Sequence, residues 1–335
     1  MTYPRSRTIS KTEDGHYHII SKTVRGAFLL TSDKDDDYRK MWIIEKMIFL
    51  SNIFYIGTES YAIMDNHMHI VVETQYRIAD KADPEDIAFR WLYLHPKRKI
   101  KEGESPAPTK KEIKEFISNK KQVAIYREKL RDPSCYMQEL NQTIARRANK
   151  EDNTSGRFWQ GRFKCINLAE AGALLKCIMY VELNPVRAAI VKSPELSKFT
   201  SCYKRVKAEL AREKLKKKPK NKELQEEAKL DSWLSPIFNT RKKTGVLNMT
   251  FKEYLELLDW TGREIREDKR GAIPDHLEPI LERLKLKSDN WIDSFKSFRR
   301  DFHTVAASEG TMRKMAKKVK TSWFHGVGAA NQHFV

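Results

Sequence analysis

Two histidines placed two residues apart, His67 and His69, are the residues of this chain best suited to carry chemistry. The alternation of side chains over residues 67–73 predicts a β-strand. Successive side chains of a strand point to opposite faces, so both imidazoles share one face while Met68 and Ile70 point to the other, under a helix layer. Two imidazoles on one rigid face form half of a metal site. The alternative is a pair of half-buried histidines in an ordinary strand.

A second His-x-His pair, His16 and His18, lies in another predicted strand. At most one of the two pairs is expected to be the metal site, because so short a motif also arises by chance. The choice between the pairs therefore depends on the residues that the rest of the chain can bring beside them.

A nucleophile from a neighbouring helix would complete a site built on His67 and His69. A polar ligand one turn from a tyrosine lies on the same helix face, because positions i and i+4 are neighbours. Tyr180 has such a ligand in Asn184. The other helical tyrosines have leucine or lysine at that position; they are Tyr126, Tyr136, Tyr203 and Tyr254. The alternative for Tyr180 is a core residue of an amphipathic helix.

Basic and aromatic residues interleave over residues 156–164, as is typical where bases stack on rings and phosphates pair with cations. The alternative is an ordinary strand with a buried Phe/Trp face. A further arginine follows the tyrosine helix, and it is either another phosphate contact or a partner in a surface ion pair. The candidate DNA contacts are Arg157, Trp159, Arg162, Lys164 and Arg187.

The elements that must position these residues alternate between strands and helices. Hydrophobic spacing predicts strands at 16–30, 53–63 and 67–73, and helices at 38–52, 133–150 and 168–184. The dipeptide Asp65-Asn66 suits a hairpin turn, and Pro185 ends the last helix. The fold class is therefore α+β, with an antiparallel sheet and helices on one face.

The length of 335 residues suits about two domains. Residues 1–195 hold the motifs, with a charged, proline-broken helical insertion at about 76–130. Residues 196–335 form a basic, all-helical C-terminal region that could bind DNA or a partner. Its stretch 203–230 is interpreted as a linker or exposed arm. Later helices are predicted after a capping box at Thr250 and Glu253, and at 276–287, 289–303 and 308–322.

The composition points to a polyanionic partner. Lys and Arg number 64 against 45 Asp and Glu, a formal net charge of +19, which favours nucleic acid over a merely solubilising surface charge. No apolar run reaches the roughly 18 residues of a membrane span, and no secretory signal is visible. The four cysteines lack paired spacing, so we expect reduced thiols and a cytoplasmic location. We also expect association with the nucleoid, given the expected nucleic-acid partner.

Three segments, in this order, resemble the motifs of the single-tyrosine HUH transposases, specifically the branch of REP-associated tyrosine transposases. They are residues 64–69 (Met-Asp-Asn-His-Met-His), 156–164 and 180–188. Residues 257–263 and 268–274 resemble the C-terminal region of the longer members, so the resemblance covers most of the chain. Each motif is moderately specific, and three in order are strongly so.

The resemblance implies a ferredoxin-like or RRM-like sheet, the HUH fold, with the strand at 67–73 in its centre. The implied nucleophile is Tyr180, and the implied ligands of Mg²⁺ or Mn²⁺ are His67, His69 and Asn184. The pair His16 and His18 falls on the first strand, outside the metal site, as structural or substrate-side residues. Two departures from the family pattern, Asp65 and Met68, remove no ligand.

The implied activity is cleavage and rejoining of single-stranded DNA through a 5′-phosphotyrosine, at palindromic REP-like hairpins. The expected partner is single-stranded DNA with a hairpin, and no membrane partner is expected. The protein is expected to act as a monomer or a dimer. Basic C-terminal residues could grip the hairpin or form an ordinary solvated face; they are Arg299, Arg300, Arg313, Lys314, Lys317, Lys318 and Lys320.

Three other functions compete with this one. A catalytically inactive, domesticated DNA- or RNA-binding regulator would have no need of intact His67, His69, Tyr180 and Asn184. A rolling-circle initiator or relaxase often carries paired tyrosines or a third histidine on the HUH strand, and neither occurs near these positions. A zinc hydrolase built on both histidine pairs would need a carboxylate ligand and would form no protein–DNA bond.

Overall fold

The computed structural model describes residues 8–31, 37–99, 106–238, 245–264 and 305–318, together with Phe324, Gly326, Gly328 and Ala330. The predicted helices at 276–287 and 289–303 lie outside the described residues. The same holds for the motif at 268–274 and for Arg299, Arg300 and Lys320.

Five strands form one sheet in the order β2-β3-β1-β4-β5. Their bounds are β1 Gly15–Lys22, β2 Ile56–Ile63, β3 His67–Thr74, β4 Lys164–Leu168 and β5 Val305–Ala306. The first four strands pair antiparallel, and β5 adds a parallel pair at the edge of β4. The predicted hairpin through Asp65-Asn66 and the interior position of the histidine strand are both confirmed.

Three helices pack closely on the sheet and match their predicted ranges. They are α1 (Tyr38–Ser51), α6 (Pro133–Glu151) and α7 (Ala171–Glu182). A short helix, α8 (Asn184–Arg187), follows α7 directly and has Pro185 in its first turn. Proline has no amide hydrogen to continue the hydrogen-bond ladder of α7, which explains why the two helices are separate.

The strand register gives the sheet two distinct faces. Ile20 of β1 pairs with His69 of β3, and Lys22 pairs with His67. Opposed residues point the same way, so these side chains share one face, which we call the histidine face. The alternate residues, such as Ile19 and Ile70, point to the other face, which we call the far face.

The far face is covered by α1 and α6, as the prediction of a helix layer over Met68 and Ile70 requires. Tyr17, Ile19 and Ile70 are fully buried there. They share one hydrophobic cluster with residues spaced by three or four along each helix: Ile43, Ile44, Met47 and Leu50 of α1, and Tyr136, Met137, Leu140 and Ile144 of α6. This spacing is what places one face of each helix on the sheet.

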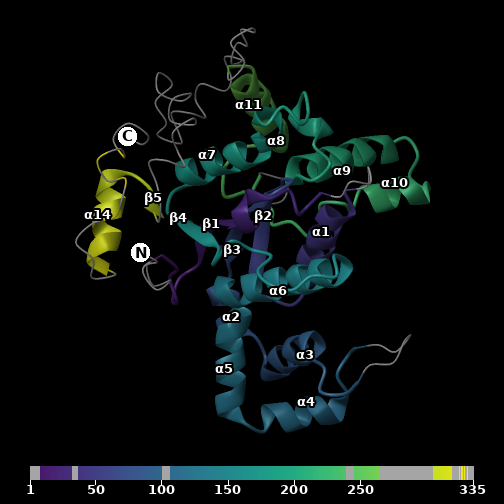
Figure 1. The fold of residues 1–335 in the computed structure, drawn as a ribbon, viewed down its shortest axis with the longest axis vertical. Helices are drawn as coiled ribbons and strands as arrows, with labels where there is room; N and C mark the ends of the chain where they lie inside the picture. The colour runs from purple at the N-terminus through teal and green to yellow at the C-terminus, as the bar shows by residue number, and fades with distance from the viewer. Residues whose placement is uncertain are drawn as a thin grey trace.

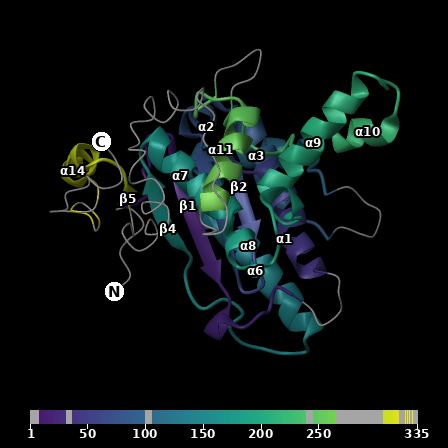
Figure 2. The ribbon, with the colours of Figure 1, turned by 90° about the horizontal axis from the view of Figure 1, so that it is seen from above.

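The prediction of helices on only one face is wrong, because the histidine face is covered too. Part of that face is apolar: Ala62, Val71 and Ile166 are buried there against α7. Two later helices, α9 (Ser201–Leu215) and α11 (Phe251–Glu264), complete the cover. Figures 1 and 2 show α7, α8, α9 and α11 on one side of the sheet and α6 on the other.

The predicted insertion forms a helical subdomain below α6 in Figure 1. It consists of α2 (Tyr76–Lys81), α3 (Pro84–Leu94), α4 (Lys110–Ile117) and α5 (Lys120–Leu130). Side-chain caps fix the helix starts: Asp83 caps α3, and Thr109 forms a capping box with Glu112 at α4. These caps satisfy backbone amides that a helix start leaves without partners.

The C-terminal region is not purely helical, because β5 joins the sheet before α14 (Glu309–Lys318). A strand of two residues is too short to show a pattern in the sequence. The predicted capping box is confirmed, since Glu253 N donates to Thr250 Oγ1 at 3.2 Å. The arm at 203–230 is a helix pair, α9 and α10 (Lys222–Glu227), whose first helix packs on β2. The proposed boundary at residue 195 stays a prediction.

None of the described helices combines the length and apolar character needed to cross a membrane.

Candidate active site on the histidine face

Four ring side chains from three elements meet at one end of the histidine face. The rings of His67 and His69 on β3 have centres 5.0 Å apart, nearly perpendicular to each other. Tyr180 on α7 presents its ring edge-on to His69, with 5.5 Å between centres. The structure thus brings together the histidine pair and the tyrosine that the sequence proposed.

The fourth ring belongs to His18 of β1, which the sequence placed outside the metal site. Its Nε2 lies 2.8 Å from Nδ1 of His69, and its ring stacks on that of His69 with 5.0 Å between centres. It also lies edge-on to Tyr180 at 6.1 Å. His18 therefore orients His69 from the neighbouring strand. The role became visible only with the strand register, which the sequence did not supply.

Hydrogen bonds decide which nitrogen of each predicted ligand could bind a metal. Asn66 Nδ2 donates to the carbonyl oxygen of Gly26 at 2.9 Å, which turns the amide oxygen of Asn66 toward His67. That oxygen lies 2.6 Å from Nδ1 of His67. Because an amide oxygen only accepts, Nδ1 carries the hydrogen and Nε2 is the atom of His67 that could bind a metal. In His69, the bond to His18 occupies Nδ1, so Nε2 is again the atom that could bind a metal.

The spacing of the two imidazoles fits a shared ion. With nitrogen–metal bonds of about 2.1 Å, two imidazoles on one ion have ring centres about 5 Å apart, and those of His67 and His69 are 5.0 Å apart. Within the described ranges, no group of three or more His, Cys, Asp or Glu side chains is arranged to hold a metal. A third protein ligand would have to be of another type, such as an amide.

Asn184, the predicted third ligand, is the first residue of α8. Its Nδ2 donates to the carbonyl oxygen of Tyr180 at 3.1 Å, so Oδ1 is the atom that could bind a metal. This bond holds the amide beside the tyrosine across the break between the two helices. Its part as a metal ligand stays a prediction.

The tyrosine helix is fixed by burial and by a polar anchor. Every residue of α7 from Gly172 to Glu182 is buried, and Tyr180 itself is 7% exposed. The carboxylate of Glu182 accepts hydrogen bonds from Ser201 of α9 at 2.5 Å and from Tyr254 of α11 at 2.5 Å. Burial raises the pKa of Glu182 despite these donors and Arg205. Helices from the C-terminal half of the chain thus hold Tyr180 in place.

Two basic residues lie within two helical turns of Tyr180 along the chain. The guanidinium of Arg187 lies 5.1 Å from the centre of the Tyr180 ring, and burial lowers the pKa of Arg187 to about 10. Lys176 lies one turn before Tyr180 on the same helix and is 2% exposed. Burial lowers its pKa to about 7. Lys176 was not among the predicted site residues, although a lysine within the apolar run from Leu174 to Ile178 is unusual.

His16 lies at the opposite end of the histidine face and belongs to a different cluster. Its Nδ1 is 2.9 Å from Oε1 of the buried Glu59. Burial acts to lower the pKa of His16, but the charge and hydrogen bond of Glu59 outweigh it, so the pKa is raised. Burial also raises the pKa of Glu73 nearby. This end of the face is held by an ion pair, away from Tyr180.

The predicted DNA contacts divide into exposed cations and an anchored aromatic. Arg157, Arg162 and Lys164 are exposed, and Lys164 pairs with Ile20, which puts it on the histidine face. Trp159 is half-buried in the far-face cluster, and its Nε1 donates to the carbonyl oxygen of Asn141 at 2.9 Å. The segment has a buried aromatic side and an exposed basic side, but it is a loop leading into β4 and not the ordinary strand of the alternative interpretation; its contact with DNA stays a prediction.

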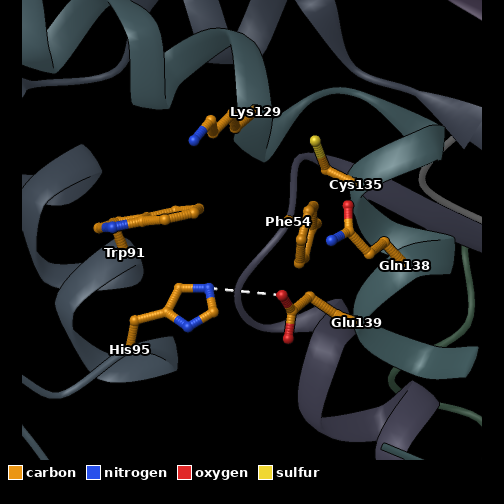
Figure 3. Close-up of a pocket in the computed structure, with 7 residues that line it drawn as sticks. All are labelled: Phe54, Trp91, His95, Lys129, Cys135, Gln138 and Glu139. Atoms are coloured by element: carbon orange, nitrogen blue, oxygen red, sulfur yellow. Dashed lines mark ion pairs between the residues drawn. The ribbon is translucent and has the colours of Figure 1, made fainter. Parts of the chain in front are cut away.

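A pocket of about 260 Å³ lies elsewhere, between α3, α5 and α6. Figure 3 shows Trp91, His95 and Lys129 facing Phe54, Gln138 and Glu139 across it. Nε2 of His95 lies 3.4 Å from Oε1 of Glu139. None of the predicted site residues lines this pocket, so it is separate from the candidate active site.

No protein-family model and no curated protein matches the chain. Among solved structures, the chain is similar to a REP-associated tyrosine transposase bound to a REP hairpin. The two share 14% identical residues over 60% of this chain and 82% of the other, with a TM-score of 0.35. At this identity and TM-score, the likeness does not indicate a function.

Proposed function

We propose that the chain is a metal-dependent transposase of the HUH fold that cleaves and rejoins single-stranded DNA. The convergence of His67, His69 and Tyr180 carries the proposal, with ring centres 5.0 and 5.5 Å apart. The order strand, helix, strand, strand, helix, strand, with sheet order β2-β3-β1-β4, supports a ferredoxin-like arrangement under this site.

Nε2 of His67 and Nε2 of His69 would hold Mg²⁺ or Mn²⁺, with Oδ1 of Asn184 as a third ligand. Imidazole with an amide oxygen suits Mn²⁺ and tolerates Mg²⁺. A bound cation would polarise the scissile phosphate and stabilise charge on its oxygens.

Tyr180 is the nucleophile in this proposal. Its phenolic oxygen attacks phosphorus, and the bond to the 3′ oxygen breaks, leaving a 5′-phosphotyrosine and a free 3′-OH. The phenol loses a proton and the leaving 3′ oxygen gains one, so protons balance. The cation of Arg187 beside the ring favours negative charge on the attacking oxygen and on the phosphate. Rejoining is the reverse attack by a 3′-OH, which needs no ATP.

The substrate we propose is an unpaired strand beside a palindromic, REP-like hairpin, a target that follows from the motif resemblance. Arg157, Arg162 and Lys164 are exposed, and Lys164 lies on the histidine face, which supports the proposal that these cations contact phosphates of the bound strand. The half-buried Trp159 fixes this segment and offers its outer side to a base.

A covalent trapping assay tests the proposal. Labelled hairpin DNA with an unpaired tail is incubated with the protein and Mn²⁺ and run on a denaturing gel, beside the variants Tyr180→Phe and Tyr203→Phe. A metal-dependent adduct lost only in Tyr180→Phe is the expected result. An adduct that persists in Tyr180→Phe would assign another nucleophile. Binding on a native gel without any adduct would instead favour a regulator that only binds DNA.

A further inference from the structure

A short loop after β1 forms a rim beside the histidine site. We call residues 23–28 the rim loop. The last residue of β1, Lys22, pairs with His67, so the rim loop begins at the end of the sheet where the predicted metal ligands lie. Its side chain Phe28 is 66% exposed. Arg25 is exposed and has φ of 54°, a left-handed conformation that non-glycine residues rarely adopt.

The exposure of Phe28 is built into the fold, because hydrogen bonds fix the loop on both sides. Oγ1 of Thr23 donates to the carbonyl oxygens of Ala27 at 2.6 Å and Asn66 at 2.9 Å. The backbone amide of Leu30 donates to the carbonyl oxygen of Asp65 at 2.9 Å. The loop that carries Phe28 is thereby fixed beside the turn between β2 and β3, which immediately precedes His67.

One residue joins the rim loop to the predicted metal ligand. The side-chain amide of Asn66 donates to the carbonyl oxygen of Gly26 and accepts from Nδ1 of His67, at 2.9 and 2.6 Å. The backbone that presents Arg25 and the orientation of the His67 ring are therefore set by the same amide.

The chemistry of this rim suits an unpaired nucleotide. Lys22 and Arg25 are exposed cations, and Phe28 is an exposed ring that follows them within six residues of the chain. Cations for the backbone beside a ring for the base are the two parts of a single-strand contact. Trp159, the aromatic residue that the sequence favoured, is half-buried and packs toward the far face.

We infer that the rim loop is a single-strand DNA contact of the histidine site, in which Phe28 stacks on an unpaired base and Arg25 contacts the adjoining phosphate. The inference rests on the proposed function for its substrate class. It assigns to these two residues the task of holding the strand beside His67.

Equilibrium binding without metal tests this contact apart from catalysis. Two labelled DNA hairpins are titrated in EDTA, one with an unpaired tail and one blunt. Phe28→Ala is expected to weaken binding of the tailed hairpin about 5- to 100-fold and to leave the blunt hairpin unchanged. Phe89→Ala, which removes another exposed ring on α3 (41% exposed), is the matched control and is expected to change neither.

Arg25→Gly tests the phosphate contact separately. Glycine accepts the positive φ, so the loop conformation is kept while the charge is removed. The slope of log affinity for the tailed hairpin against log salt is expected to fall in magnitude by about 0.7, the value for one single-strand phosphate contact. Phe28→Ala should leave that slope unchanged.

Equal binding of the tailed hairpin by Phe28→Ala and the unchanged chain would overturn the rim contact, as would an equal loss on both hairpins. An adduct in the trapping assay combined with either result keeps the transposase proposal and rejects the rim. If Phe28→Ala weakens binding of the tailed hairpin alone and no adduct forms in the trapping assay, the rim contact is supported and cleavage is rejected.

Discussion

The two faces of the sheet are built from the same strands, yet they differ in where apolar packing ends. On the far face, Tyr17, Ile19 and Ile70 carry apolar packing along the sheet under α1 and α6. On the histidine face, Val71 belongs to an apolar cluster, but the residue of β3 that precedes it on this face is the buried His69. The far face is therefore an apolar core, whereas the histidine face combines apolar packing with the buried ring cluster of the candidate site.

The helices over the two faces differ in a related way. The residues of α1 and α6 that face the sheet are apolar at helical spacing, and the two buried cations of α1, Arg39 and Lys40, pair with carboxylates. In contrast, α7 is buried on all sides, and its buried residues include Lys176, Tyr180 and Glu182. Buried ionisable groups cost stability unless they are paired. This difference in packing predicts that the two faces respond differently to mutation.

Removing a predicted ligand should have the largest effect. His67→Ala is expected to lower adduct formation by at least about 1,000-fold, because a metal that stabilises phosphate charge contributes several kcal/mol. His16→Gln, at the other end of the same face, should retain activity. The measurement is the rate of adduct formation at saturating Mn²⁺. Equal rates in His67→Ala and the unchanged chain would remove the metal site from this end of the sheet.

A cavity in the far face should reduce stability and leave chemistry intact. Ile70 is fully buried, so Ile70→Ala is expected to lower the free energy of unfolding by about 3 to 4 kcal/mol, and Ile70→Val by about 1 kcal/mol. Urea denaturation measures both. The adduct yield per folded molecule should not change. A loss of adduct from fully folded Ile70→Ala would show that the two faces are not independent.

Lys176 should make the histidine side of the molecule sensitive to pH. Burial lowers its pKa to about 7, so between pH 7 and the ordinary lysine pKa the unfolded chain binds a proton that the folded chain does not. The burial of Lys176 therefore lowers the free energy of unfolding by its full amount at and below pH 7. This reduction becomes smaller as the pH rises toward 10. Lys176→Met is expected to raise the free energy of unfolding by about 2 to 3 kcal/mol at pH 7.

The gain in Lys176→Met should shrink steadily between pH 7 and pH 10. Lys114→Met on the exposed side of α4 is the control, and it should show no such trend. Denaturation curves at several pH values measure both variants. A gain that is constant with pH would mean that Lys176 is charged in the folded chain throughout this range.

The sequence predicted the elements well because their signals are local. The spacing of apolar residues gave α1, α6 and α7, and the turn dipeptide Asp65-Asn66 gave the β2–β3 hairpin. The site residues His67, His69 and Tyr180 followed from spacing and motif, and the fold brings them together. Their chemical roles stay predictions.

The features that were missed depend on distant parts of the chain. His18 joins the site only because of the register between β1 and β3, which no local pattern encodes. The cover of the histidine face by α9 and α11 depends on segments more than 100 residues from β3. The burial of Trp159 follows from its position opposite Thr23, where its ring points to the far face. Long-range pairing, and not local propensity, decided each of these.

Mapping the adduct within the chain is the most direct test of Tyr180 as the nucleophile of a metal-dependent reaction. The trapped protein is treated with nuclease and trypsin, and the peptide that retains a nucleotide is identified by mass spectrometry. Cleavage after Lys176 and Arg187 gives a peptide with a single tyrosine, Tyr180. The account predicts a nucleotide on that peptide, formed only with metal and absent from His67→Ala. A nucleotide on another tyrosine peptide, or one that forms equally in EDTA, would contradict it.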